Sequence, residues 1–196
     1  GRKDAFPGVA TADIKQGSIT ENAGNNMSIM NGIQNPGSFY TWGSNWNTNY
    51  RYYNLWSADN TTTGYNDNSV VKTVYDPCPV GFKIPANNAF TGFTANGQNF
   101  GTMNVDGTDN WQTYQNNFGH NFWTNSSKSA TINFPASGYR DENDGSLKYV
   151  GNFGNYWSAV SSNTSGGCSL FFYLGNVNPL NSNLRSYGCA ARPVAE

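Results

Sequence analysis

The chain has 196 residues, only 12% of them charged, and a formal net charge of -1 at pH 7. A single domain of this length buries roughly two-thirds of its unfolded surface, so we expect one core that needs neither a structural metal nor a disulfide framework. The charge balance leaves no basic footprint for a phosphate backbone, so nucleic acid is not an expected partner.

Uncharged polar and aromatic residues take the place of charge. Asn is more frequent than the 22 Gly, and aromatic residues make up 15% of the chain, with 12 Tyr and 6 Trp. Disordered chains lack aromatic residues, so the sequence predicts a folded domain. Tyr, Asn, Ser and Gly are also the main residues of antibody binding surfaces, although Asn and Gly equally fill the loops of a loop-rich fold.

The predicted elements are short, because Gly, Pro and Asn interrupt nearly every helical window. Residues 86–95 offer Asn87 or Asn88 as a helix N-cap and place Phe90 and Phe93 three positions apart. The second helix is expected at 108–118, and strands are expected at 70–75, 130–134, 147–150, 169–174 and 190–194. The pattern predicts an irregular α+β domain with long loops.

The acidic stretch 141–145 has two interpretations. It lacks the spaced ligands and distal Glu of an EF-hand calcium loop. Asp144-Gly145 between Tyr139 and Leu147 instead predicts a hairpin turn.

No catalytic residue, metal site or cofactor is expected. The sequence contains no nucleotide-binding loop, hydrolase elbow or zinc-protease helix, and His120 stands among aromatic residues, which favours a packed or surface histidine. Cys78, Cys168 and Cys189 form no CxxC pair, so one disulfide with a spare thiol and three free thiols both remain open.

The segment 75–85 reads Tyr-Asp-Pro-Cys-Pro-Val-Gly-Phe-Lys-Ile-Pro. It resembles the YDPCPxGW/FxxP signature of bacterial surface domains in the C-type-lectin-like superfamily, which include pilus tip adhesins. The segments 35–40, 54–56, 137–140 and 144–147 are similar to other parts of these domains, so the resemblance covers roughly residues 30–195.

The last third carries a second resemblance, through Tyr156-Trp157-Ser158, the segment 175–179, Arg185, Gly188 and Arg192-Pro193-Val194. It is similar to the variable region of proteins diversified by diversity-generating retroelements, in which Asn codons are mutated at adenine while the scaffold stays fixed. The resemblance implies a C-type-lectin-like fold, with short helices around a small irregular antiparallel sheet. It also implies a lead-in at 1–30, packed on or linking to an upstream domain, a ligand-binding domain at 31–196 and a variable region at about 155–190.

Alternation along the strand 169–174 gives two apolar or aromatic faces, with Leu170, Phe172 and Leu174 on one and Phe171 and Tyr173 on the other. Either the strand is buried on both faces or one face binds a ligand. On the second interpretation Phe171, Tyr173, Leu180 and Leu184 form one exposed patch, and Cys168 lies near the surface. The expected ligand-binding residues are Ser162, Asn163, Ser165, Cys168, Ser169, Phe171, Tyr173, Leu174, Asn178, Leu180, Ser182, Asn183 and Leu184.

The resemblance therefore implies a non-enzymatic, adhesin-like binding domain at the bacterial cell surface, for an unknown protein or glycan on another cell, phage or host. The Glu-Pro-Asn and Trp-Asn-Asp calcium motifs of conventional lectins are absent from the sequence. One alternative is a structural pilus or envelope subunit, and another is an oxidase of the formylglycine-generating type using Cys168 and Cys189.

The chain starts at Gly1 and has no apolar run for a signal peptide or membrane insertion, as expected of a piece of a longer precursor. We further expect Trp157 and Arg192-Pro193 to be buried or strand-paired, Cys78 to lie inside the fold, and the two termini to lie close together.

Overall fold

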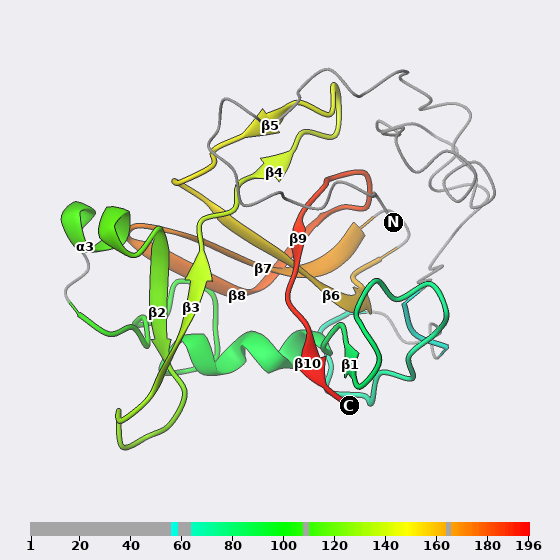
Figure 1. Cartoon of the computed structure of the whole chain (residues 1–196), viewed down its shortest axis with the longest axis horizontal. Coiled ribbons are helices and arrows are strands. Elements are labelled where there is room, and N and C mark those ends of the chain that lie inside the picture. The colour runs from blue at the N-terminus through cyan, green and yellow to red at the C-terminus, as the bar shows by residue number, and fades with distance from the viewer. Residues whose placement is uncertain (1–55, 59–63, 108–109, 164–165) are drawn as a thin grey trace.

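The computed structural model describes residues 56–58, 64–107, 110–163 and 166–196. Its largest element is a four-stranded sheet of order β8-β7-β6-β9 (Figure 1). Strands β6 (Gly154–Ser161), β7 (Gly166–Tyr173) and β8 (Asn176–Leu184) form an antiparallel meander, and β9 (Ala190–Ala191) joins β6 in parallel.

Three two-stranded antiparallel ladders and two short helices surround this sheet. The ladders are β1 (Phe82–Lys83) with β10 (Val194–Ala195), β2 (Gly119–Trp123) with β3 (Thr131–Pro135), and β4 (Tyr139–Arg140) with β5 (Leu147–Lys148). The helices are the 3-10 helix η4 (Asn87–Phe93) and the α-helix α3 (Trp111–Asn116). The described residues thus confirm an α+β domain in which short strands predominate.

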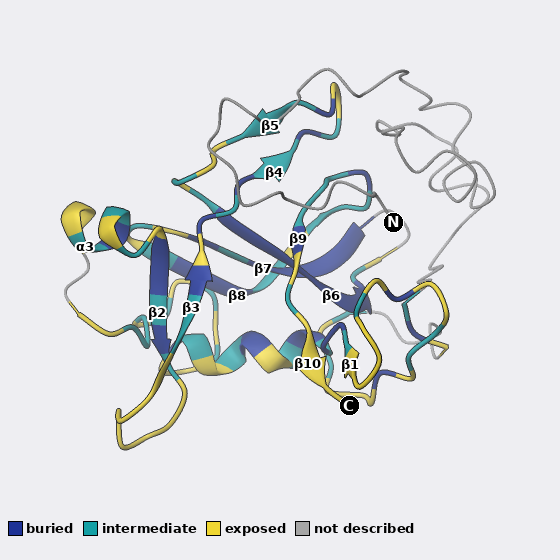
Figure 2. Cartoon of the chain, in the orientation of Figure 1, coloured by how far each residue is buried: buried dark blue, intermediate teal, exposed yellow. Residues whose placement is uncertain are grey.

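An aromatic core lies between the sheet and the elements on one side of it. Strand β7 contributes Leu170 and Phe172, which are both fully buried, and these pack with Phe90 of η4, Phe122 of β2 and Phe134 of β3. The rings of Phe122 and Phe172 meet edge to face with their centroids 5.7 Å apart, a favoured arrangement for aromatic pairs. Figure 2 shows how deeply the central strands are buried.

Glycine allows the strands of the sheet to pack this closely. Gly154 lies directly opposite Phe172, and a Cβ on Gly154 would stand 2.0 Å from the Phe172 ring. A Cβ on Gly167 would stand 2.9 Å from the ring of Trp157. Each glycine therefore makes room for a ring that covers it from the neighbouring strand.

The segment 75–85 has a structural role at the end of the domain where β1 pairs with β10, which we call the base of the domain. The Asp76 carboxylate accepts hydrogen bonds from the backbone N–H of Cys78 (2.7 Å) and of Ile84 (3.0 Å). The Lys72 ammonium donates to the carbonyls of Cys78 and Pro79, both at 2.8 Å, and to that of Phe82. Two charged side chains thus satisfy the backbone groups of a turn that regular structure leaves unpaired.

Both predicted helices are confirmed, with shorter bounds. Ala86, rather than Asn87 or Asn88, is the N-cap of η4, because the Asn87 side chain turns inward and donates to the Pro179 carbonyl. Asn110 caps α3 by accepting from the Thr113 N–H at 2.9 Å.

The predicted strands at 130–134 and 169–174 are confirmed, and those at 147–150 and 190–194 are confirmed as two-residue strands. The strand at 70–75 is wrong, because with the described part of the chain this segment makes only a single bridge, between Ser57 and Lys72. Its Lys72 bonds to the signature turn, and Val74 is 90% exposed. The hairpin turn at 144–145 is confirmed, since it connects β4 to β5.

The expectation for Trp157 is confirmed, but that for Arg192-Pro193 is wrong, because Arg192 is half-buried, Pro193 is exposed, and both lie between β9 and β10 rather than in a strand. Trp157 is 8% exposed and pairs with Ser169 on one side and Ala191 on the other. The Arg192 guanidinium lies 4.9 Å from the centroid of the Phe134 ring, a cation–π contact. Strand β10 closes the described chain against β1. Residues 1–55, which hold the lead-in, the N-terminus and the segment 35–40, lie outside the described residues.

Candidate functional site

The register of the sheet decides which side chains share a face. Residues opposite each other in antiparallel strands point to the same side, and β7 alternates without interruption. Leu170 and Phe172 face the core, so Ser169, Phe171 and Tyr173 lie on the other side. We call this second side the outer face.

The expected patch of Phe171, Tyr173, Leu180 and Leu184 is wrong as a single surface. Leu184 pairs with Gly166, an even-numbered position of β7, which places it on the side of Leu170 and Phe172. An irregularity in the β7–β8 pairing between Ser169 and Phe171 adds one residue to β8, which shifts the alternation of that strand. Phe171 and Tyr173 share the outer face without either leucine.

The surface position expected for Cys168 is also wrong. Cys168 is 0% exposed, because its strand is central and its side is the core side of the sheet. Of the expected ligand-binding residues, Cys168, Ser169 and Asn178 are buried; Ser162, Phe171, Leu174, Leu180, Asn183 and Leu184 are half-buried; Asn163, Tyr173 and Ser182 are exposed; and Ser165 lies outside the described residues.

Asparagine dominates the β8 side of the outer face. The outer-face partners of Tyr173, Phe171, Ser169 and Gly167 are Asn176, Asn178, Asn181 and Asn183. The amides of Asn181 and Asn183 donate to the Ser169 hydroxyl at 3.1 and 3.2 Å, and the Asn183 amide also donates to the side-chain Oδ1 of Asn155 at 3.4 Å. Amides that both donate and accept thus occupy every β8 position on this face.

Six aromatic rings form a continuous row from β7 across the outer face to the β4–β5 hairpin. Successive centroids lie 5.8, 5.3, 4.4, 5.8 and 5.2 Å apart. In order along the row, the residues are Tyr173, Phe171, Phe153, Tyr149, Tyr139 and Tyr187. We call this set the aromatic row.

Tyr149 is the most prominent member of the aromatic row. Its backbone is left-handed, with φ of 57°, and its side chain is 50% exposed. A bulky residue in this conformation is an outlier that costs about 1–3 kcal/mol, and such strain tends to occur at functional positions. The Tyr149 ring stacks on Phe153 at 4.4 Å with an interplanar angle of 18°, and the centroid of the Tyr139 ring lies 5.8 Å from it.

Helix α3 and strand β2 fix the elements that carry these rings. The Tyr114 hydroxyl donates to the Asn152 carbonyl at 2.7 Å, and the Gln115 amide donates to the Gly151 carbonyl at 3.3 Å. His120 Nε2 lies 3.1 Å from the Tyr173 carbonyl oxygen. His120 is 5% exposed among the rings of Tyr114 and other core residues, which confirms its interpretation as a packed histidine.

The β4–β5 hairpin supplies the charges nearest to the aromatic row. Lys148 forms an ion pair with Asp141 at 3.0 Å. Burial acts to raise the pKa of Asp141, but hydrogen bonds from the Asn143 backbone and Lys148 outweigh it and lower that pKa. Burial and a hydrogen bond to the Glu142 carboxylate raise the pKa of Tyr187.

The cysteines show no sign of nucleophilic activation. All three are free thiols. Burial raises the pKa of Cys168 to about 12, and burial together with the Asp76 carboxylate raises that of Cys78 to about 12, whereas a reactive thiol requires a lowered pKa. Cys189 contacts the Asn183 amide on the outer-face side, away from the core side that holds Cys168. The pair that oxidase chemistry would use is therefore not brought together.

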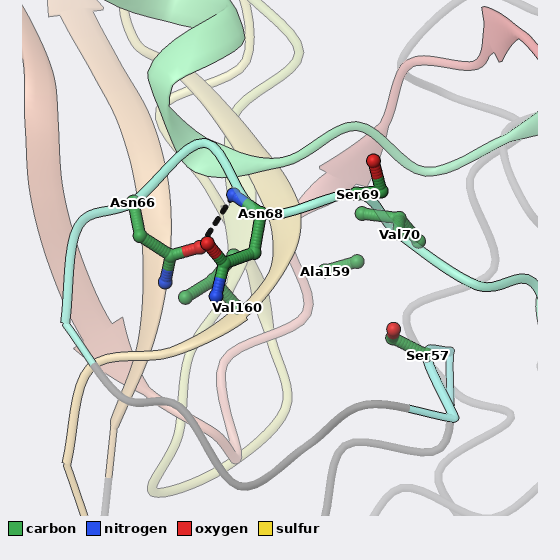
Figure 3. A pocket seen from close by; sticks show the side chains of 7 residues that line it. All are labelled: Ser57, Asn66, Asn68, Ser69, Val70, Ala159 and Val160. Atoms are coloured by element: carbon green, nitrogen blue, oxygen red, sulfur yellow. Dashed lines mark hydrogen bonds between the residues drawn. The ribbon is translucent and has the colours of Figure 1, made fainter.

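The described residues contain no cluster of metal ligands, because no group of three or more His, Cys, Asp or Glu side chains among them is placed to hold a metal ion. A small hollow lies between Ser57, the segment 66–70 and Ala159-Val160 (Figure 3). Its volume of about 20 Å³ accommodates little more than one water molecule.

Phe171 and Tyr173 were predicted as site residues from the sequence, but the other four residues of the aromatic row were not. Tyr139, Tyr149, Phe153 and Tyr187 stand in segments with no common spacing, and only tertiary contacts bring them together. The available signal was the run Tyr149-Val150-Gly151-Asn152-Phe153, in which two aromatic residues flank a turn.

Part of the chain is similar to one known protein family. No curated protein and no solved structure matches the chain significantly. No helix within the described residues is long and apolar enough to cross a membrane. Residues 102–194 match a family described as a domain of unknown function, DUF8237, and this stretch contains the four-stranded sheet and every residue of the aromatic row.

Proposed function

We propose that this chain is a ligand-binding, adhesin-like domain of C-type-lectin-like fold, carried by a secreted or surface-displayed bacterial protein. The aromatic row carries this proposal. Its six rings connect three separate segments, yet Tyr149 and Tyr173 remain 50% and 39% exposed. Exposed aromatic residues gathered on one surface mark interaction sites, and Tyr provides contact area at low entropic cost.

The topology supports the fold part of the proposal. A meander of three antiparallel strands leads into the C-terminal segment, and β10 returns to pair with β1, the first described strand. The β8 side supports diversification, because all four of its outer-face positions hold Asn, the residue that the retroelement template would encode.

The experiment measures adhesion. The domain, made multivalent on fluorescent beads, is incubated with a panel of bacterial and host cells. Tyr149→Ala and Tyr173→Ala should each weaken binding by about 1–3 kcal/mol, as expected for interface anchors. Trp111→Ala is the matched control, because Trp111 is an aromatic residue on α3 that is 54% exposed and is not a member of the aromatic row. Equal binding by all four proteins would refute the proposed surface.

A structural subunit is the second candidate, and one observation favours it. The base of the domain exposes apolar side chains, including Val74 at 90%, Val80 at 97% and Phe82 at 44%. Isolated apolar side chains are common on surfaces, but several close together suit docking to another subunit. If a Val80→Asp, Phe82→Asp variant lost assembly while Tyr149→Ala retained it, the structural role would be favoured.

A further inference from the structure

We propose that the ligand of the aromatic row is a neutral oligosaccharide, bound by ring stacking and by amide hydrogen bonds without a metal ion. This inference rests on the proposed function and names the ligand class of the same site.

The exposed rings have the shape that a sugar ring needs. The Tyr149 side chain is 50% exposed, and Phe153 backs its ring in a nearly parallel stack, with the Tyr139 centroid 5.8 Å away, so the exposed part of the ring is a supported platform. Tyr173, which is 39% exposed, has its ring centroid 6.0 Å from that of Phe153 and gives a second platform. The apolar face of a pyranose ring stacks on such a surface, and its hydroxyl groups remain free at the edges.

The polar groups beside the platforms match hydroxyls. Asn176 pairs with Tyr173, and the series continues with Asn178, Asn181 and Asn183. A primary amide offers two donors and an acceptor, which suits vicinal hydroxyls that also donate and accept. Asn176, Asn181 and Asn183 are half-buried, whereas Asn178 is buried and its Oδ1 accepts a hydrogen bond from the Phe100 N–H.

Charge indicates a neutral ligand. Residues 149–184, which supply the sheet meander and four of the six rings, contain no Asp, Glu, Lys, Arg or His. The hairpin that supplies Tyr139 carries three carboxylates, on Asp141, Glu142 and Asp144, against two cations, on Arg140 and Lys148. A sialylated or sulfated glycan would find no excess of positive charge here.

A protein ligand fits this surface less well. Protein interfaces centre on aliphatic and aromatic anchors in desolvated pockets, often with Arg. Leu184 faces the other side of the sheet, the two Phe members of the row are half-buried, and Arg185, two positions before Tyr187, is half-buried as well. The outer face offers flat rings and amides instead.

The test treats the target cells before bead binding. Periodate oxidises vicinal diols of glycans, and a broad protease removes surface proteins. Binding in EDTA should be lost after periodate, survive protease, and be competed by neutral oligosaccharides but not by sialylated ones. On an array of neutral and acidic oligosaccharides, Tyr149→Ala should weaken binding about tenfold or more, Tyr149→Phe should retain most of it, and Trp111→Ala should match the unaltered protein.

The outcomes separate this inference from the proposed function. Loss of binding after protease but not after periodate would identify a protein ligand and overturn the glycan, although the domain would remain an adhesin. Preference for acidic glycans, or loss of binding in EDTA, would likewise overturn it. Beads that bind no cell would refute the proposed function itself. Tyr149→Gly is the fold control, because it relieves the left-handed backbone and should not lower the melting temperature even though binding falls.

Discussion

Substitution of Gly154 by alanine tests the strand register on which the assignment of the outer face depends. Gly154 lies opposite Phe172, and a Cβ there would be 2.0, 2.2 and 2.6 Å from three atoms of that ring, whereas ordinary contacts are 3.4–4 Å. The ring is 0% exposed and lies against Phe122, Tyr156 and His120, so it has no free space to move into.

The expected cost is at the upper end for overpacking, about 3 kcal/mol of unfolding free energy. For a domain of this size that lowers the melting temperature by roughly 6–12 °C. Urea unfolding followed by tryptophan fluorescence measures the free energy, and Gly92→Ala is the control, because nothing lies within 4 Å of a Cβ there and Gly92 is exposed.

A second variant identifies the cause. Phe172→Leu shortens the side chain that the new methyl group meets, so Gly154→Ala combined with Phe172→Leu should cost at least about 1 kcal/mol less than the sum of the single changes. A Gly154→Ala protein as stable as the unaltered one would show that Gly154 does not face Phe172. A slip of one residue exchanges the two faces of β6, and the outer face would then be wrongly assigned.

Three further predictions concern β7, the thiols and the signature turn. Phe172→Ala should cost about 3–5 kcal/mol, because it leaves a cavity, whereas Tyr173→Ala, at a side chain that is 39% exposed, should cost about 1 kcal/mol or less; equal losses in urea titrations would contradict the assignment of faces. In the native protein Cys168 should resist thiol reagents until urea unfolds the domain, and rapid labelling at pH 8 would contradict its burial. Because burial raises the pKa of Cys168 to about 12 from an ordinary value near 9, the unfolded chain loses that proton first, so stability should be unaffected below pH 9 and fall as pH rises from 9 to 12. Asp76→Ala should cost about 2–4 kcal/mol, because one buried and one partly buried backbone N–H group lose their acceptor, and a cost below about 0.5 kcal/mol would show that the turn holds without it.

The sequence alone determined the local features of this protein. Phe90 and Phe93 at helical spacing predicted η4, the Asp144-Gly145 pair predicted the β4–β5 turn, and period-two alternation separated Phe172 from Phe171 and Tyr173. Each of these depends on residues within a few positions of one another, where backbone geometry fixes which side chains are neighbours.

Only the tertiary structure decided which segments meet. The interpretation of Cys168 as a surface residue failed because burial depends on the neighbouring strands, and the grouping of Phe171 with Leu184 failed because an extra residue in β8 changes its alternation. The aromatic row joins Tyr139, Tyr149 and Phe153 to β7 through ring contacts between segments that have no common period, and such contacts follow from how the chain packs rather than from any local pattern.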